Sequence, residues 1–316
     1  MPAASDKLTL VTRTQVGNAA LKDGTVKPKT FTPEFVEVDP LIAAFRRMVR
    51  GHEFDITEMA ITTYMAAKAY GKKFTAVPVF IVRAFHHGAI LVNKNAGVSA
   101  PKDLAGKKVG VNRGYTVTTG VWARGIMQDE YGLDLAKVNW VLSGDEHVEE
   151  YKAPANVTPI EKGKKMEDML IAGELAAAIG VSVDHPDVVP LIPNAAEAGF
   201  AALQRTGHYP INHLIVIKDE LIASRPGLAR DVFETFAEAK RIYVEKLKAG
   251  AVELKGDAKM HQRVMEITGG DPMPYGIAPN LKNIENLIAH AKTQGILSGN
   301  ERIEDLFAKE TLELTA

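Results

Sequence analysis

The chain has 316 residues, which is long for a single hydrophobic core, so we expect two lobes. Its 38 Lys and Arg residues nearly balance its 39 Asp and Glu residues, and a net charge of −1 gives no overall field that attracts nucleic acid or an anionic membrane. The absence of cysteine excludes disulfides, thiolate metal ligands and a cysteine nucleophile. We therefore expect neither a nucleic-acid partner nor a membrane partner.

The N-terminal segment 1–7 lacks the basic start, apolar stretch and small-residue cleavage site of a secretory signal. No apolar stretch in the sequence is long enough to span a bilayer. We expect a cytoplasmic protein, and a periplasmic one only if a signal peptide has been removed.

Short apolar strands alternate with helical patterns along the first third of the chain. The strands expected there cover residues 8–11, 35–38, 54–59, 77–82 and 89–93, and the helices cover 41–49 and 62–70. This alternation indicates βαβ units and a mainly parallel sheet.

The same pattern starts again near residue 99, where Ser99 and Pro101 are typical of a helix start. Strands are expected at 109–111, 138–142, 176–181 and 212–217, helices at 118–131, 165–173, 227–247, 261–268, 281–294 and 303–307, and a surface loop at 145–159.

These elements predict an α/β fold of two lobes that are joined by two crossings, near 90–98 and 205–214. Residues 1–92 and 213–316 would form a discontinuous lobe I, and residues 93–212 an inserted lobe II. A cleft between such lobes is a favoured place for a ligand.

The segment 109–122 is the strongest local feature, because a strand ends in a small-residue turn that opens a helix. Backbone N–H groups and the helix dipole make such a turn suitable for an anion. We expect Asn112, Tyr115, Thr116, Thr118 and Thr119 to bind substrate there. The alternative is an ordinary helix start that is capped by Thr116 or Thr118.

Several segments, in this order between about residues 45 and 307, together resemble the 4,5-dihydroxyphthalate decarboxylase family. They are 54–59 (FDITEM), 77–80 (VPVF), 83–87 (RAFHH), 115–132, 209–213 (YPINH), 274–276 (PYG) and 294–297 (QGIL). The resemblance implies a type II periplasmic-binding-protein-like fold that serves as a lyase without an organic cofactor. It also implies kinship with solute-binding proteins.

Decarboxylation of a hydroxylated ring needs an anion clamp, a proton donor and an acceptor for ring hydroxyls. Histidine suits the proton donor because its ordinary pKa is about 6.5. We expect the donor to be His86, His87 or His213, and Glu58 to accept a hydroxyl or orient a histidine. The two further binding residues that we expect are Arg83, as the carboxylate clamp, and Tyr275, as a ring-stacking or lid residue.

Each of these residues also has a structural interpretation. Arg83 would pair with an acid, the histidines would be solvated or structural, Glu58 would complement a helix start and Tyr275 would stiffen a turn.

The chain also departs from its relatives. They usually carry Arg-His where this chain has His86-His87, and arginines in place of the segments 143–146 and 180–183. Fewer cations favour a monocarboxylate or a phenol over a dicarboxylate.

The leading hypothesis is a cofactor-independent decarboxylase of a hydroxylated aromatic acid, 4,5-dihydroxyphthalate or a related compound. The alternative is a solute-binding protein that captures a small aromatic carboxylate without chemistry. Both hypotheses name a small-molecule carboxylate as partner. The sequence shows no recognisable set of metal ligands, so we expect no metal site, and the need for a metal is left open. Whether the protein forms a homo-oligomer is left open.

Overall fold

The computed structural model describes residues 7–316, so the segment 1–6, which bears on the expectation about a signal peptide, lies outside the described residues. Two compact units make up the chain. Unit 1 comprises the described residues up to Arg83 together with Ile211–Glu285 and Glu301–Ala316, and unit 2 comprises Ala84–Pro210 and Asn286–Asn300. Within the described part no helix is both long and apolar enough to cross a membrane.

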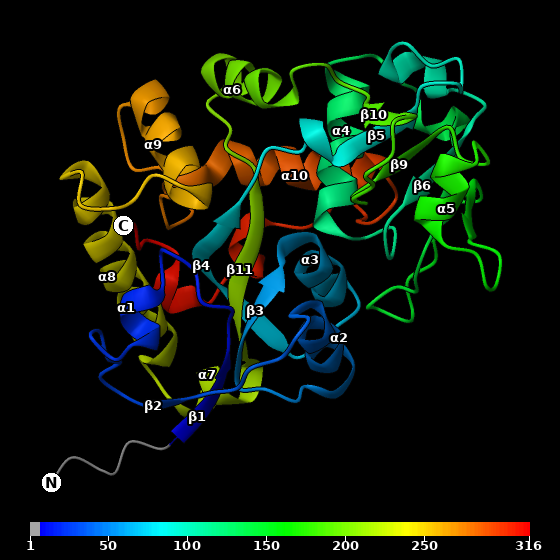
Figure 1. Cartoon of the computed structure of the whole chain (residues 1–316). Coiled ribbons are helices and arrows are strands. Elements are labelled where there is room, and N and C mark those ends of the chain that lie inside the picture. The colour runs from blue at the N-terminus through cyan, green and yellow to red at the C-terminus, as the bar shows by residue number, and fades with distance from the viewer. Residues whose placement is uncertain (1–6) are drawn as a thin grey trace, which may run out of the picture. The chain divides into compact units, whose positions relative to one another are not determined.

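Unit 1 contains a five-stranded sheet in the order β2-β1-β3-β11-β4. Strands β1, β2 and β3 are parallel, whereas β11 runs antiparallel to both of its neighbours. Helices α2 and α3 lie on one side of these strands and α1 and α8 on the other (Figure 1). The elements of unit 1 are β1 (Lys7–Val11), α1 (Ala19–Lys22), β2 (Thr32–Phe35), α2 (Ile42–Gly51), β3 (Ile56–Ala60), α3 (Ile61–Ala69), β4 (Phe74–Arg83), β11 (Ile211–Lys218), α7 (Asp219–Ser224), α8 (Leu228–Lys248), α9 (Gly256–Thr268) and the 3-10 helices η4 (Ala278–Asn280), η5 (Ile303–Leu306) and η6 (Lys309–Thr311).

Unit 2 contains a six-stranded sheet in the order β10-β5-β9-β6-β7-β8. Strands β9, β6, β7 and β8 are parallel, and β5 is antiparallel to β9 and β10. The elements of unit 2 are η1 (His87–Ala89), β5 (Ile90–Asn93), η2 (Pro101–Leu104), β6 (Lys108–Val111), α4 (Thr118–Asp129), η3 (Leu135–Lys137), β7 (Asn139–Leu142), β8 (Val157–Pro159), α5 (Met166–Ile171), β9 (Ala177–Ile179), β10 (Val188–Pro190) and α6 (Ala195–Thr206). Helix α10 (Leu281–Thr293) carries residues of both units.

The strands are buried in the way that the apolar runs predict. All five residues of β3 are buried, as are eight of the ten residues of β4. In unit 2 the side chains of Val141, Met169, Leu170 and Ala178 pack in one core cluster. Burial of these apolar side chains provides most of the stabilisation of each sheet, because each Å² of apolar surface removed from water contributes about 25 cal/mol.

The unit boundaries differ from those expected from the sequence. The first division falls between Arg83 and Ala84, not between 92 and 93, because β5 hydrogen-bonds to β9 and β10 of unit 2. The second division falls between Pro210 and Ile211, and Asn286–Asn300 also belongs to unit 2. The residues His86 and His87 therefore belong to unit 2.

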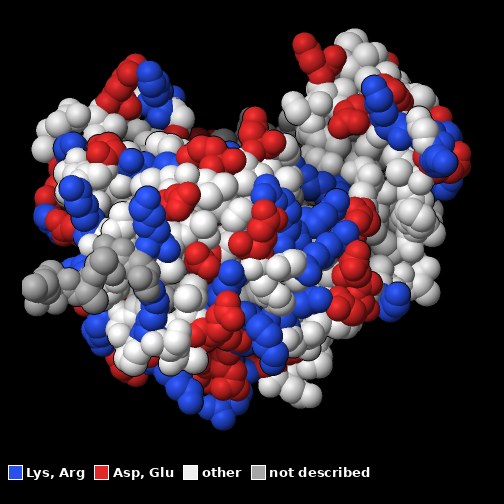
Figure 2. Space-filling model, turned by 90° about the horizontal axis from the view of Figure 1, so that it is seen from below, with Lys and Arg blue, Asp and Glu red and all other residues white. Residues whose placement is uncertain are grey.

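The sheets are mixed, which corrects the prediction of a mainly parallel sheet. On the surface, acidic and basic side chains are intermingled over the face shown in Figure 2. This agrees with the near-zero net charge of the whole chain.

Candidate functional site

Glu58 and His213 form a hydrogen-bonded pair in unit 1. His213 faces Ala60 in the antiparallel pairing of β3 and β11, and Glu58 lies two residues from Ala60 on the same face of β3. The Nδ1 atom of His213 is 2.6 Å from Oε1 of Glu58. The sequence predicted both residues as candidates, and the structure brings them together.

Three further residues hold the Glu58 carboxylate. Oε2 accepts hydrogen bonds from the Thr12 hydroxyl (2.7 Å) and from the backbone N–H of Arg13 (3.2 Å). The side-chain amide of Gln15 donates to both carboxylate oxygens, at 3.1 and 3.2 Å. Because both oxygens are occupied by protein donors, Glu58 orients a histidine here and does not offer a free acceptor to a ring hydroxyl.

The charge of Glu58 determines which ring nitrogen of His213 carries a hydrogen atom. Burial acts to raise the pKa of Glu58, but the hydrogen bond and charge of His213, with the donors Thr12 and Arg13, bring this pKa below its ordinary value. An ionised carboxylate only accepts hydrogen bonds, so Nδ1 of His213 must be protonated.

The other ring nitrogen of His213 is available for chemistry. None of the hydrogen bonds described for residues 7–316 engages Nε2 of His213, and the side chain is 19% exposed. Phe45 packs against the imidazole edge-on at 5.2 Å. This arrangement of a buried carboxylate, an oriented imidazole and an open Nε2 is suited to general acid–base catalysis.

Arg83 has a structural partner within unit 1. Its Nη2 atom donates to the Pro274 carbonyl (2.8 Å) and to Oδ1 of Asn280 (2.6 Å). These bonds connect the end of β4 to the turn that holds Tyr275. The predicted role of Arg83 as a carboxylate clamp is therefore not supported by these contacts, which hold a backbone turn.

Tyr275 is fully buried, with its ring under the ammonium group of Lys240 at 4.7 Å. Its hydroxyl has no hydrogen-bond partner among the described residues and lies 3.8 Å from the position that a Cβ of Gly17 would take. Burial raises the pKa of this hydroxyl above its usual value. A fully buried ring favours the alternative that Tyr275 stiffens a turn, and its role as a ring-stacking or lid residue stays a prediction.

The predicted anion-binding turn of unit 2 is occupied by a side chain of the protein itself. The carboxylate of Glu146 accepts hydrogen bonds from the backbone N–H groups of Tyr115 and Thr116 and from the Thr116 hydroxyl. Next to it, the amide of Asn112 donates to the Gly180 carbonyl (2.7 Å) and accepts from the Ser143 hydroxyl (3.0 Å). The turn thus binds the carboxylate of Glu146, and binding of a substrate carboxylate there stays a prediction.

The helix after this turn has no side-chain cap. Val117 is the N-cap residue of α4, so the predicted cap by Thr116 or Thr118 is not formed. Thr118 is buried, and the side chain of Thr119 lies 3.7 Å from the Cβ position of Gly180. The roles of both threonines in binding stay predictions.

The histidines of the RAFHH segment are buried, and His87 lies far from the turn. His86 and His87 are 3% and 2% exposed. Nε2 of His87 is 3.3 Å from Glu130, just beyond the end of α4, whereas the turn precedes its start. The 12 residues of α4 span about 18 Å, so the two features lie at opposite ends of this helix. His87 instead lines a cavity of about 330 Å³ with Trp122, Glu130 and His290.

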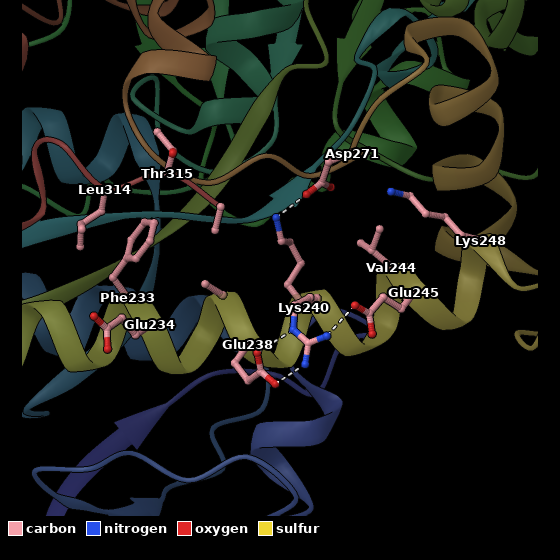
Figure 3. A pocket seen from close by; sticks show the side chains of 13 residues that line it. Phe233, Glu234, Glu238, Lys240, Val244, Glu245, Lys248, Asp271, Leu314 and Thr315 are labelled. Atoms are coloured by element: carbon pink, nitrogen blue, oxygen red, sulfur yellow. Dashed lines mark hydrogen bonds and ion pairs between the residues drawn. The ribbon is translucent and has the colours of Figure 1, made fainter.

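A larger groove of about 560 Å³ runs along α8 in unit 1 (Figure 3). Five of its charged groups are paired with one another: Lys240 with Asp271, and Arg241 with Glu238 and Glu245. None of the predicted site residues lines it. We therefore do not assign the chemistry to this groove. Over residues 7–316, no group of three or more His, Asp or Glu side chains is arranged to hold a metal ion.

Sequence reasoning missed Thr12, Gln15 and Glu146. Thr12 and Gln15 follow β1, the parallel neighbour of β3, and Glu146 follows β7, the parallel neighbour of β6. Carboxyl ends of parallel strands meet at one edge of a sheet, where ligands bind in open α/β folds. This rule, applied to the strands expected at 8–11 and 138–142, points to the segments that follow them, which contain all three residues, but it does not say what each residue contacts.

The fold defines the class of protein. A periplasmic sulfonate-binding protein from Methylobacillus flagellatus is similar with a TM-score of 0.51 and 9% identity, over 96% of this chain and 92% of the other. A Candida albicans protein described as having the generic periplasmic binding protein fold gives a TM-score of 0.52 at 12% identity, over 98% of both chains. The chain has the periplasmic-binding-protein fold, as the sequence predicted.

The sequence places the chain more closely within this class. It is 28% identical over 310 residues to a 4,5-dihydroxyphthalate decarboxylase from Comamonas testosteroni, a match that covers 93% of each chain. It is 36% identical over 169 residues to a protein of the same name from Pseudomonas putida, which covers 51% of this chain and 64% of that relative. No protein-family model matches the chain. The chain is a homologue of these 4,5-dihydroxyphthalate decarboxylases, which confirms the resemblance in its motifs.

Proposed function

We propose that this protein is a carboxy-lyase that removes CO₂ from a hydroxylated aromatic carboxylic acid, 4,5-dihydroxyphthalate or a related compound. The observation that carries the proposal is the Glu58–His213 pair, which presents an oriented imidazole with an open Nε2 atom. The names of the two curated homologues support the same chemistry.

In the proposed reaction, the Nε2–H group of a protonated His213 donates its proton to the ring carbon that bears the carboxylate. A ring hydroxyl supplies electron density, the bond to the carboxylate breaks, and its electron pair restores the aromatic ring as CO₂ leaves. A proton from the solvent then restores Nε2–H, so each turnover consumes one proton and releases one CO₂. Glu58 stabilises the imidazolium through Nδ1–H, in the way that a carboxylate orients a catalytic histidine.

This scheme assigns the proton to His213 and not to His86 or His87. Nε2 of His87 faces Glu130, and His86 is buried, whereas His213 combines partial exposure with a fixed carboxylate partner. The scheme uses only side chains of the protein, so we also propose that it needs no organic cofactor.

The rival function is capture of a small aromatic carboxylate without chemistry, because one fold serves both receptors and enzymes. The missing arginines at 143–146 and 180–183 favour this rival. Purified protein should be incubated with 4,5-dihydroxyphthalate, phthalate and 3,4-dihydroxybenzoate, with and without EDTA, while ring absorbance and released CO₂ are followed. We expect CO₂ in an amount that matches the loss of substrate and is insensitive to EDTA. Tight binding of unchanged ligands would support the receptor instead.

A further inference from the structure

The side chain of Asn18 is fully buried in the segment that connects β1 to α1. Its Oδ1 atom accepts a hydrogen bond from the backbone N–H of Gln15 (2.7 Å). Its Nδ2 atom donates to Oγ1 of Thr12 (3.1 Å) and to the Arg13 carbonyl (2.9 Å). These partners fix the orientation of the amide, because an N–H group needs an acceptor and a carbonyl needs a donor.

Helix capping does not explain this asparagine. Asn18 is the N-cap residue of α1, a position where the side chain of an asparagine often accepts a hydrogen bond from the first turn of the helix. Here the side chain makes no such bond, and it contacts the residues that follow β1 instead. The Asn18 side chain therefore orders the segment 12–15, which also holds the Glu58 carboxylate.

Asn18 determines where Thr12 directs its hydroxyl hydrogen. The Thr12 hydroxyl can donate to Oε2 of Glu58 (2.7 Å) or to the Arg13 carbonyl (3.3 Å). Asn18 already donates to this carbonyl and to Oγ1 of Thr12. The Thr12 hydrogen is therefore directed to Glu58, because the competing carbonyl lies farther away and already has a donor.

We propose that Asn18 is a positioning residue of the Glu58–His213 pair, which acts by directing the Thr12 hydroxyl to Glu58. None of the hydrogen bonds described for residues 7–316 joins Asn18 to Glu58 or to His213, so its action is indirect. A buried carboxylate needs donors to stay ionised and in place, and an ionised Glu58 keeps a hydrogen atom on Nδ1 of His213. The proposal rests on the proposed function only in taking His213 as the proton donor.

Replacement of Asn18 by alanine tests this role, because the Thr12 hydroxyl can then turn to the Arg13 carbonyl. We expect kcat for CO₂ release to fall by about tenfold or more, with KM within about twofold of the wild type, since a misplaced acid weakens the transition state and not substrate binding. In the protein without ligand, the titration midpoint of the Glu58 carboxyl ¹³C signal should move to higher pH. The reason is that Glu58 loses a donor that stabilises its charged form and lowers its pKa.

Asn93→Ala is the matched control. Asn93 is a buried asparagine of unit 2 with the same set of bonds: its Nδ2 atom donates to the carbonyls of Leu170 (2.9 Å) and Ile171 (3.1 Å), and its Oδ1 atom accepts from the backbone N–H of Asn95 (2.9 Å). Its loss should lower the melting temperature about as much as the loss of Asn18. It should change neither kcat nor the titration of Glu58, which separates positioning from a general loss of stability.

A double-mutant cycle with Thr12→Val tests the route of the effect. In this background the hydroxyl that Asn18 directs is gone, so Asn18→Ala should lower kcat by less than about threefold further. An equal loss in both backgrounds would show that Asn18 does not act through Thr12 and would overturn the proposal. Asn18→Ser has one polar atom for three partners and should show the same changes at a smaller size, so it decides the question if the alanine variant does not fold.

The proposal is also overturned if a folded Asn18 variant keeps kcat within twofold of the wild type, or if the titration midpoint of Glu58 stays where it is in the wild type. If the wild type releases no CO₂, the proposed function fails by itself. The titration of Glu58 in the ligand-free protein then decides the positioning role alone.

Discussion

Replacement of Glu58 by glutamine tests the Glu58–His213 pair at Nδ1 of His213, the atom whose protonation depends on the carboxylate. The amide has nearly the shape of the carboxylate, so the donors Thr12 and Arg13 can stay bonded to the remaining oxygen. The NH₂ group then faces Nδ1 of His213, which must become an acceptor and carry its hydrogen on Nε2. His213 would be held as a neutral imidazole, which is a much weaker acid than an imidazolium.

The expected loss follows from the loss of an effective general acid. General acid–base catalysis contributes about 10²- to 10⁴-fold, so kcat of Glu58→Gln should fall by about this factor, which is about 2.7–5.5 kcal/mol of barrier. The assay is the initial rate of CO₂ release at saturating substrate, across a range of pH. The unfolding free energy, from urea titration, should change by no more than about 3 kcal/mol because a single buried hydrogen-bond set is altered.

Glu37→Gln is the matched control, because it removes an exposed carboxylate of the same unit that pairs with Lys22. Its kcat should equal that of the wild type. If Glu58→Gln kept more than a third of the wild-type kcat in a folded protein, the orienting role of Glu58 would be refuted.

Three further predictions concern buried groups of unit 1. Burial lowers the pKa of His261 from 6.5 to about 4, so the contribution of the neutral imidazole to stability is complete above pH 6.5 and is lost as the pH falls towards 4. The unfolding free energy should therefore drop by about 3 kcal/mol over this range. In urea titrations, His261→Gln should lack this part of the pH dependence. Arg83→Ala should lower the unfolding free energy by about 2–4 kcal/mol, because the acceptors Pro274 and Asn280 lose charge-assisted bonds; a loss below about 1 kcal/mol would contradict the structural role. Tyr275→Phe removes a buried hydroxyl without a described partner and should leave the melting temperature unchanged or higher, whereas a clear decrease would show that the hydroxyl is bonded.

The long buried strands and the longest helix could be predicted from the sequence. The apolar runs at 77–82 and 212–217 became β4 and β11, and the helical pattern at 227–247 became α8 (Leu228–Lys248). Their sequence patterns are strong because each segment packs against the core along several helical turns or several strand residues, so the apolar pattern repeats several times.

Other elements had weak local signals. Strands β8 and β10 have three residues each, too few to show a period of two. Helix α6 contains Gly199, which normally argues against a helix interior. Here a Cβ at Gly199 would meet the Phe85 ring at 2.6 Å, so tertiary packing selects the glycine. The strand expected at 35–38 ends at Phe35, and the helix expected at 303–307 is only the 3-10 turn η5.

The candidate site was predictable in its residue types and less so in its pairings. Glu58 and His213 are 155 residues apart, and only the antiparallel register of β3 and β11 brings them together. The anion-binding turn was recognisable from its glycine and threonines, but the residue that fills it, Glu146, comes from a segment that reads as a surface loop. Long-range pairings of this kind have no local sequence signature.

The most direct test of the account is a comparison of binding and turnover in His213→Gln. Affinity for 4,5-dihydroxyphthalate should be measured by calorimetry and CO₂ release by direct detection, with the wild type alongside. We predict an affinity within about threefold of the wild type and a turnover reduced by about 100-fold or more. Undiminished CO₂ release from the folded variant would contradict the central claim that Nε2 of His213 delivers the proton.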